Sequence, residues 1–185
     1  MITEKLTKRN AEIINRKGGA MSNNNFVEVI IEIPKGCRNK YEFDKERKVF
    51  KLDRMLFSSM HYPSDYGFIL ETLAEDGDPL DVLVLLGEPT FPGCLIEAKP
   101  VGLFLMRDEK GLDHKILSVP VHDPQWNHIG KLSEVPPHLL LEIGHFFDVY
   151  KELEKKKTAV EGWEDAPVAL RVIAEARDRF RAAKR

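Results

Sequence analysis

Long apolar runs and cysteine clusters are both missing from this 185-residue sequence. No stretch approaches the ~18 consecutive apolar residues that a membrane-spanning helix needs, and no apolar segment typical of a secretory signal lies near the start. The two cysteines, Cys37 and Cys94, lie far apart and lack the spacing of a metal site. We therefore expect free thiols in a reducing compartment and a cytoplasmic protein that does not contact a membrane.

An excess of positive charge is missing as well. The 28 lysines and arginines are balanced by 30 aspartates and glutamates, so the formal net charge is −2. Because a nucleic-acid-binding surface is usually basic, this balance predicts that nucleic acid is not a partner. Hydrophobic residues make up 43% of the chain and no internal repeat is visible, which is typical of a globular domain with its own core.

The first twenty residues differ in charge from the rest. They carry five basic and two acidic residues, which gives them a charge of +3 and leaves −5 for residues 21–185. Met21 is followed by Ser-Asn-Asn-Asn, so we expect the fold to begin near Phe26. We interpret residues 1–22 as a flexible N-terminal extension, native or added by cloning, and residues 23–185 as a single domain. A transit peptide is the weaker interpretation, because the segment lacks serine and contains two acids.

Short extended segments dominate the sequence up to residue 121. The run from Phe26 to Ile33 is rich in β-branched residues and ends at Pro34, which predicts a strand. Similar patterns predict strands near residues 40–44, 49–52, 66–70, 80–86, 95–106 and 114–121. The run 80–86 is almost entirely apolar and is expected at the centre of a sheet.

Helical periodicity appears only in the C-terminal third. Pro136 and Pro137 precede an apolar stripe, spaced by three or four residues, that continues to Leu153 and predicts one helix. A second helix is expected after Asp165, a suitable N-cap. Many short strands followed by two helices predict an α+β, mainly β architecture in which helices pack on a small closed sheet.

An acidic turn is the strongest local signal for chemistry. Asp76, Asp78 and Asp81 lie within a Glu-Asp-Gly-Asp-Pro-Leu-Asp segment whose glycine and proline prevent a regular helix. Three carboxylates this close repel one another and need a positive partner, and Mg²⁺ is commonly held by carboxylates, water and substrate phosphates. The spacing does not match an EF-hand, which requires glycine and glutamate at positions that are filled differently here. Taken alone, the segment could also be a solvated acidic turn.

A second acidic group extends this signal. Asp108, Glu109 and Asp113 lie in an expected hairpin connection, and two acidic clusters at neighbouring strand ends could converge as phosphoryl-transfer sites require. Phosphate chemistry also needs cations and hydroxyl groups that face the oxyanions. The candidates are Lys40, Arg54, Lys115, Lys151, Tyr62, Tyr66 and Tyr150. Each tyrosine could instead be a packing residue and each lysine a surface charge, so the residues alone indicate a metal- and phosphate-binding α+β domain.

Ordered motifs across residues 26–180 carry a resemblance to a known family. They include Ile-Glu-Ile-Pro at 31–34, Lys-Tyr-Glu at 40–42, Leu-Asp-Arg at 52–54, Asp-Gly-Asp-Pro-Leu-Asp at 76–81, Tyr-Lys at 150–151 and Val-Glu-Gly-Trp at 160–163. With these motifs the sequence resembles the family I soluble inorganic pyrophosphatases of the prokaryotic type. The resemblance implies a five-stranded, OB-like closed barrel with flanking helices, including two main helices in the C-terminal third, and an acidic cavity.

The same resemblance implies a role for each matched residue. The expected cofactor is Mg²⁺, and its expected ligands are Asp76, Asp81, Asp113, Asp108 and Glu32. The expected substrate-binding groups are Lys40, Arg54, Tyr66, Lys115, Tyr150 and Lys151. All of these except Lys115 are also expected to take part in catalysis, together with Asp78. The residues expected to orient them are Glu42, Tyr62 and Glu109.

The implied activity is that of an inorganic diphosphatase, which hydrolyses inorganic pyrophosphate to two orthophosphates with water that Mg²⁺ activates. Asp78 is expected to act as the general base. Two alternatives stay open, a metal-dependent hydrolase of another phosphoanhydride such as a nucleotide, and a non-catalytic OB-like nucleic-acid binder. The first would need a base-binding signature, and the second a basic groove with exposed aromatic side chains.

The resemblance also bears on assembly. Prokaryotic relatives are commonly hexamers, so we expect a homo-oligomer and favour a hexamer. The predicted helix around residues 144–146 is a candidate interface. His145 could equally be a partly buried histidine whose partners lie within one chain.

Overall fold

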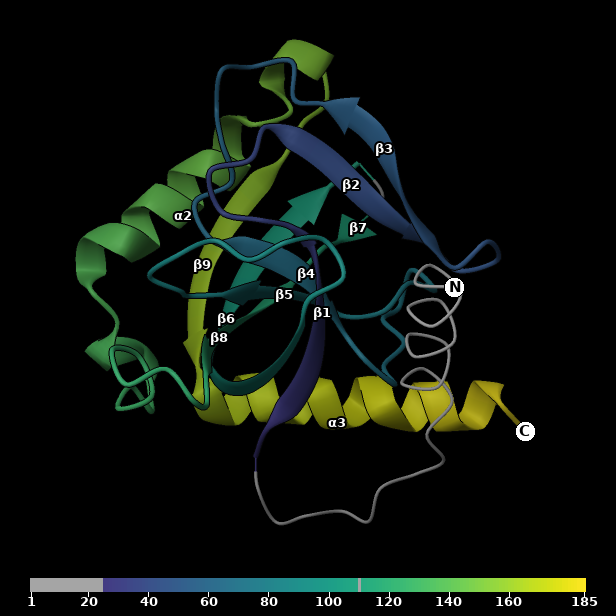
Figure 1. Cartoon of the computed structure of the whole chain (residues 1–185), viewed down its shortest axis with the longest axis vertical. Helices are drawn as coiled ribbons and strands as arrows, with labels where there is room; N and C mark the ends of the chain where they lie inside the picture. Colours follow the sequence, from purple (N-terminus) through teal and green to yellow (C-terminus); the bar gives the residue numbers. More distant parts are fainter. Residues whose placement is uncertain (1–24, 110) are drawn as a thin grey trace, which may run out of the picture.

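Five strands close into a ring in the computed structural model, which describes residues 25–109 and 111–185 (Figure 1). These strands are β1 (Val27–Ile33), β4 (Asp65–Ile69), β5 (Asp81–Val84), β8 (Lys115–Pro120) and β6 (Leu95–Asp108). They are hydrogen-bonded in the order β1-β4-β5-β8-β6, and β6 pairs with β1 again, which closes the ring. The prediction of a mainly β fold built on a five-stranded closed barrel is confirmed. The predicted N-terminal extension, residues 1–22, lies outside the described residues.

Gly67 shows how tightly the ring is closed between β1 and β4. A Cβ atom at this position would lie 1.9 Å from the carbonyl oxygen of Ile30 on the neighbouring strand, far inside any van der Waals contact. Only glycine lets the two backbones approach this closely. The residue that follows Tyr66 is therefore dictated by strand packing.

Further strands extend the sheet on both sides of β6. Two strands, β7 (Gly111–Leu112) and β9 (Ala159–Asp165), pair with it in antiparallel fashion. The hairpin of β2 (Asn39–Asp44) and β3 (Val49–Met55) forms a separate two-stranded sheet, which lies above the barrel in Figure 1. Strand β9 was not predicted from the sequence, because Gly162 and the surrounding charged residues interrupt any apolar alternation there.

Both faces of the central strands are buried, as the apolar run 80–86 predicted. On β5, Val82 and Val84 belong to one cluster of buried side chains, and Leu83 belongs to another. The neighbour β8 runs parallel to β5 and contributes Ile116 and Leu117 to the same two clusters. A strand that is buried on both faces carries apolar residues at successive positions, which explains the continuous apolar run.

Two helices cover these clusters (Figure 1). They are α2 (Pro137–Val149) and α3 (Ala166–Ala183), while η1 (Leu132–Glu134) and η2 (Glu152–Glu154) are short 3₁₀ turns. The buried residues of α2 join one cluster and those of α3 the other. Among the described residues, no helix is both long enough and apolar enough to cross a membrane.

The predicted first helix is too long at its C-terminal end. The prediction continued to Leu153, but α2 ends at Val149. Leu153 lies in η2, and 61% of its surface is exposed. The cap of α2, Tyr150, is still right-handed, and the chain continues into η2, which ends at Lys155 in a left-handed conformation with φ 58°. The apolar stripe at helical spacing therefore continues past the end of α2. Tyr150 is buried all the same and packs against the residues that end α2.

Asp165 links the start of α3 to η1. Its Oδ1 accepts hydrogen bonds from the backbone N–H groups of Leu132 and Ala166, both at 2.9 Å. These two bonds, the Leu132 bond first, lower the pKa of Asp165 below its ordinary value of 3.8. The predicted N-cap is therefore confirmed, and it also connects the helix to a segment more than thirty residues earlier.

Substitution of this cap should destabilise the fold in a pH-dependent manner. Asp165→Ala should lower the Tm by roughly 2–4 °C, the usual range for a lost N-cap in a chain of this size. Asp165→Asn keeps a neutral acceptor and should lower the Tm less. Because the folded-state pKa is lowered, the advantage of the carboxylate over asparagine is complete above the unfolded-state pKa. It is lost as the pH falls through the folded-state pKa.

The measurement is the Tm of wild type and Asp165→Asn between pH 7 and pH 3. The gap between the two should shrink toward the acidic end, since other carboxylates titrate equally in both proteins. A gap that stays constant over this range would show that the charge of Asp165 does not contribute.

Candidate active site

A cavity of about 1650 Å³ is lined by every residue that the sequence predicted for metal binding, substrate binding, catalysis or orientation. The residues come from β1, the β2–β3 hairpin, β4 and the segment before it, the loop 71–80, the start of β5, the β6–β8 region and the end of α2. The two acidic clusters, 75–81 and 108–113, thus converge on one space. The carboxylates of these clusters differ in burial and in the side chains that they contact.

Lys115 is a buried residue of the cavity wall, with a side chain that is 2% exposed. Its Nζ is 2.8 Å from Oδ2 of Asp81 and 2.7 Å from Oδ1 of Asp113, and it donates to the hydroxyl of Tyr66 at 3.2 Å. The Tyr66 hydroxyl in turn donates to Oδ2 of Asp81. Burial alone would lower the pKa of Lys115, but the charges of Asp81 and Asp113 outweigh it and raise the pKa above its ordinary value.

Strand register explains why Asp81 and Lys115 meet. Each is the first residue of its strand, and β5 and β8 are parallel with Val82 opposite Ile116. Parallel neighbours begin at the same edge of a sheet, so the residues just before this pair lie side by side. Asp113 reaches the same point from the turn before β8, where its backbone N–H donates to the carbonyl of Met106 at 3.0 Å.

The wall around Lys115 carries more negative than positive charge. Burial raises the pKa of Asp113, the charge of Asp81 adds to this, and Lys115 offsets only part of it. Burial likewise raises the pKa of Glu32 to about 7, in spite of a hydrogen bond from the N–H of Phe43 at 2.7 Å. Two carboxylates, Asp81 and Asp113, share this one ammonium, and a further cation beside them would favour the charged forms of these groups and of Glu32.

The donor set fits a hard divalent cation. All five predicted ligands present carboxylate oxygens, the donors that Mg²⁺ prefers. Within residues 25–109 and 111–185, however, no three His, Cys, Asp or Glu side chains already form a ligand cluster. Lys115 lies between Asp81 and Asp113, so the assignment of a metal rests on donor chemistry and on the two carboxylates that share one ammonium.

Asp76 and Asp78 lie at the exposed rim of the cavity. Oδ1 of Asp76 accepts from the backbone N–H of Asp78 at 3.0 Å, and Gly77 between them has φ 88°. The Asp78 side chain is 66% exposed, and its Oδ1 is 2.9 Å from Nζ of Lys45 in the β2–β3 turn. Of the three signature aspartates, only Asp81 contacts the buried lysine.

The β2–β3 hairpin supplies two cations. Lys40 and Arg54 are opposite each other in the strand register. Nζ of Lys40 is 2.7 Å from Oε1 of Glu42 and 3.6 Å from Oδ2 of Asp53. Nε of Arg54 donates to Oε1 of Glu154 at 3.0 Å, and its Nη1 donates to Asp53. Glu42, a residue expected to orient the substrate-binding groups, thus contacts Lys40, one of the expected substrate-binding residues.

The residues that follow α2 also line the cavity. Nζ of Lys151 is 2.9 Å from Oδ2 of Asp108 and 3.6 Å from Oε2 of Glu109. Both side chains of the Lys151–Asp108 pair are about nine-tenths buried, so this is an internal ion pair. The side chain of Tyr150, which precedes Lys151, is also buried.

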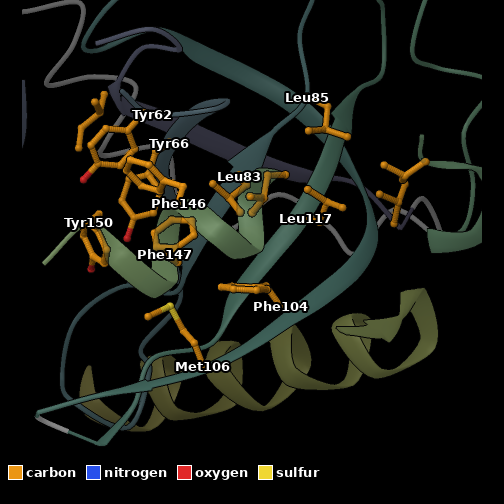
Figure 2. Close-up of a cluster of buried hydrophobic side chains, with 14 of the residues drawn as sticks. Tyr62, Tyr66, Leu83, Leu85, Phe104, Met106, Leu117, Phe146, Phe147 and Tyr150 are labelled. Atoms are coloured by element: carbon orange, nitrogen blue, oxygen red, sulfur yellow. The ribbon is translucent and has the colours of Figure 1, made fainter. Parts of the chain in front are cut away.

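Three tyrosines are both packing residues and cavity residues. Figure 2 shows Tyr62, Tyr66 and Tyr150 beside Phe146 and Phe147, with the three hydroxyl groups at one edge of the cluster. The Tyr62 ring lies 5.5 Å from the Tyr66 ring and 4.9 Å from the Phe146 ring, between centroids. Burial, and then nearby carboxylates for Tyr66 and Tyr150, raises the pKa of each phenol. The phenols therefore stay protonated and can donate to an anion.

The interpretation of the sequence gave no role to three residues that contact the predicted cations and the predicted base. Lys45 and Glu154 lie in ordinary charged stretches, and Asp53 lies in the Leu-Asp-Arg motif at 52–54. Nothing in a single sequence reports their partners, because the Arg54–Glu154 contact joins residues that are 100 positions apart.

Comparisons with known proteins agree with this geometry. Residues 29–181 match the family model described as inorganic pyrophosphatase. The inorganic pyrophosphatase of Methanosarcina mazei is 61% identical over 152 residues, which cover 82% of this chain and 90% of that protein. The one from Halalkalibacterium halodurans is 54% identical over 84% of this chain and 95% of its own length.

Structural similarity leads to the same result. The crystal structure of the inorganic pyrophosphatase from Thermus thermophilus matches with a TM-score of 0.86 at 42% identity, covering 91% of this chain and 98% of that chain. That from Neisseria gonorrhoeae matches with a TM-score of 0.84 at 34% identity, covering 91% and 99%. The chain therefore belongs to the inorganic pyrophosphatase family.

Proposed function

We propose that this chain hydrolyses inorganic pyrophosphate to two orthophosphates. One observation carries the proposal, namely a single cavity that gathers the carboxylates of two acidic segments and the cations of three separate elements in a member of the pyrophosphatase family. Pyrophosphate is small and highly charged, so a site for it needs both kinds of group. The chain is an inorganic diphosphatase, a hydrolase of a phosphorus-containing anhydride.

The reaction is metal-dependent, and we assign Mg²⁺ as the metal. The residues that would hold it are Asp76, Asp81, Asp113, Asp108 and Glu32. When bound, Mg²⁺ neutralises phosphate charge and makes water a better nucleophile near neutral pH. The two carboxylates of Asp81 and Asp113, which share the single ammonium of Lys115, support this assignment.

The chain's own residues then bind and orient the substrate. Lys40 and Arg54 approach from the hairpin, and Lys115, Lys151 and the tyrosines from the barrel and α2. Protonated phenols donate to phosphate oxygens, while the lysines and the arginine oppose the charge that develops on the leaving phosphate. Glu42, Tyr62 and Glu109 orient these groups, as the Lys40–Glu42 and Lys151–Glu109 distances support.

Asp78 is assigned as the general base that accepts a proton from the attacking water. Its exposed carboxylate at the cavity rim supports this assignment, because a base must exchange protons with solvent between turnovers. Asp81, which is fixed by Lys115 and Tyr66, is assigned to the metal instead.

We further propose a cytoplasmic homo-oligomer, with a hexamer favoured, whose catalytic domain spans residues 23–185. Both cysteines are free thiols, in keeping with a reducing compartment. On α2, the Leu141 side chain is 69% exposed and His145 is exposed too, which supports the helix as a contact surface. Size-exclusion chromatography with light scattering tests the assembly.

The activity itself is tested by phosphate release. With Mg²⁺, pyrophosphate should be hydrolysed much faster than ATP, and EDTA should abolish the release. A parallel gel-shift assay tests whether the protein binds a labelled oligonucleotide under the same conditions, and no shift is expected. Faster hydrolysis of ATP than of pyrophosphate would favour a nucleotide as the substrate, and activity in EDTA would contradict the metal dependence.

Two conservative substitutions separate the base from a metal ligand. Asp78→Asn keeps the shape of the side chain but cannot accept a proton, so kcat should fall by roughly 10²–10⁴-fold, with little change in the affinity for Mg²⁺. Asp81→Asn should weaken Mg²⁺ binding first, so that added Mg²⁺ recovers part of the rate. The measurements are kcat against Mg²⁺ concentration and direct Mg²⁺ titration without substrate. Near-full recovery of Asp78→Asn at saturating Mg²⁺ would make Asp78 a ligand.

A further inference from the structure

Glu154 is a nearly buried carboxylate, bonded to the cavity-lining Arg54, that the assignments above leave without a role. Its side chain is only 5% exposed, and its Oε1 accepts from Nε of Arg54 at 3.0 Å. Its Oε2 is 3.7 Å from Nζ of Lys156. A carboxylate that is removed from water needs such partners, and here the main partner belongs to the hairpin, 100 residues earlier in the chain.

The backbone around Glu154 is fixed relative to Lys151. The N–H of Glu154 donates to the carbonyl of Lys151 at 3.0 Å, and the N–H of Lys156 donates to the same carbonyl at 3.3 Å. Lys155 stops the turn in a left-handed conformation, and its N–H donates to the carbonyl of Glu152 at 2.9 Å. The carboxylate of Glu154 therefore starts from a backbone position that is set by Lys151.

The hydrogen bonds of Arg54 leave one side of its guanidinium for a ligand. Nε is used by Glu154 and Nη1 by Asp53, and these two acids fix the plane of the group. The hydrogen bonds that the described residues make with this guanidinium involve Nε and Nη1, and none of them involves Nη2. The planar group carries its donors in a rigid fork, so fixing two nitrogens also sets the direction of the third.

We propose that Glu154 is a positioning residue for pyrophosphate hydrolysis, which holds the guanidinium of Arg54 in a fixed relation to Lys151 so that both cations reach one substrate molecule. The proposal rests on the function proposed above. Glu154 does not attract the substrate, because its charge opposes that of pyrophosphate. Its contribution is orientation, and loss of orientation lowers turnover while leaving the attraction for the anion intact.

The first test compares Glu154→Ala and Glu154→Gln with wild type, assayed with Mg²⁺. Glu154→Ala should lower kcat by roughly 10–100-fold, the scale of a small misplacement of a reacting group, and should not raise KM. Glu154→Gln should retain more activity, because its amide oxygen still accepts from Nε. A matched control is Glu161→Ala, which breaks the Arg107 Nε–Glu161 pair outside the cavity and should leave kcat unchanged.

The second test is a double-mutant cycle with Arg54→Ala. If Glu154 acts through Arg54, Glu154→Ala should cause almost no further loss of kcat in the Arg54→Ala background. The Tm of each variant is measured in parallel, and Glu154→Gln replaces Glu154→Ala in the cycle if the alanine variant does not fold. If Glu154 had only a structural role, Glu154→Ala would lower kcat by the same factor in the wild-type and Arg54→Ala backgrounds.

The outcomes separate this proposal from the function on which it rests. An active wild type with additive losses, or with a rise in KM and no fall in kcat, overturns the role of Glu154 alone. A wild type that releases no phosphate from pyrophosphate overturns both. An active wild type with a non-additive fall in kcat that glutamine partly rescues supports the positioning role.

Discussion

The buried ammonium of Lys115 connects the fold to the site. It is held between Asp81 and Asp113, and this arrangement depends on β5 and β8 starting at the same edge of the barrel. Removing water from each ion costs several kcal/mol, which only close partners offset. Loss of one partner of such a pair typically costs about 3–5 kcal/mol, a large share of a total stability of about 5–15 kcal/mol. The same contacts that stabilise the barrel therefore place two carboxylates at the cavity wall.

The charges around this lysine are not balanced, because the two carboxylates of Asp81 and Asp113 share one ammonium. Glu32 also lies close enough for the charge of Asp81 to affect its pKa. The cavity is thus acidic near the barrel, while the hairpin and the end of α2 bring Lys40, Arg54 and Lys151 from other directions. A cation can be held at the acidic wall and an anion by the surrounding cations. This division favours a substrate whose charge is shared between metal and protein.

Much of this could be predicted from the sequence. Alternation and apolar runs predicted most of the strands, and the late helical periodicity predicted both main helices. The ordered motifs predicted the family, which the comparisons confirmed. The failures have physical causes. Strand β9 lacks alternation because of Gly162, the stripe of α2 continues past its end at Val149, and the partners of Arg54 come from distant parts of the chain. Contacts of this kind are set by tertiary packing, which no local pattern reports.

The three aspartates of the signature illustrate why a motif and a site are different things. In the sequence they are equivalent members of one acidic turn, but their surroundings divide them. Asp81 begins a barrel strand and is fixed by a buried lysine and a phenol, whereas Asp76 and Asp78 are exposed on a turn that ends before the strand. A fixed carboxylate can hold an ion in place with little reorganisation, while an exposed one can exchange protons with water. These contacts therefore separate Asp81 from the other two, whereas Asp76 and Asp78 are alike in exposure and differ only in the roles proposed for them.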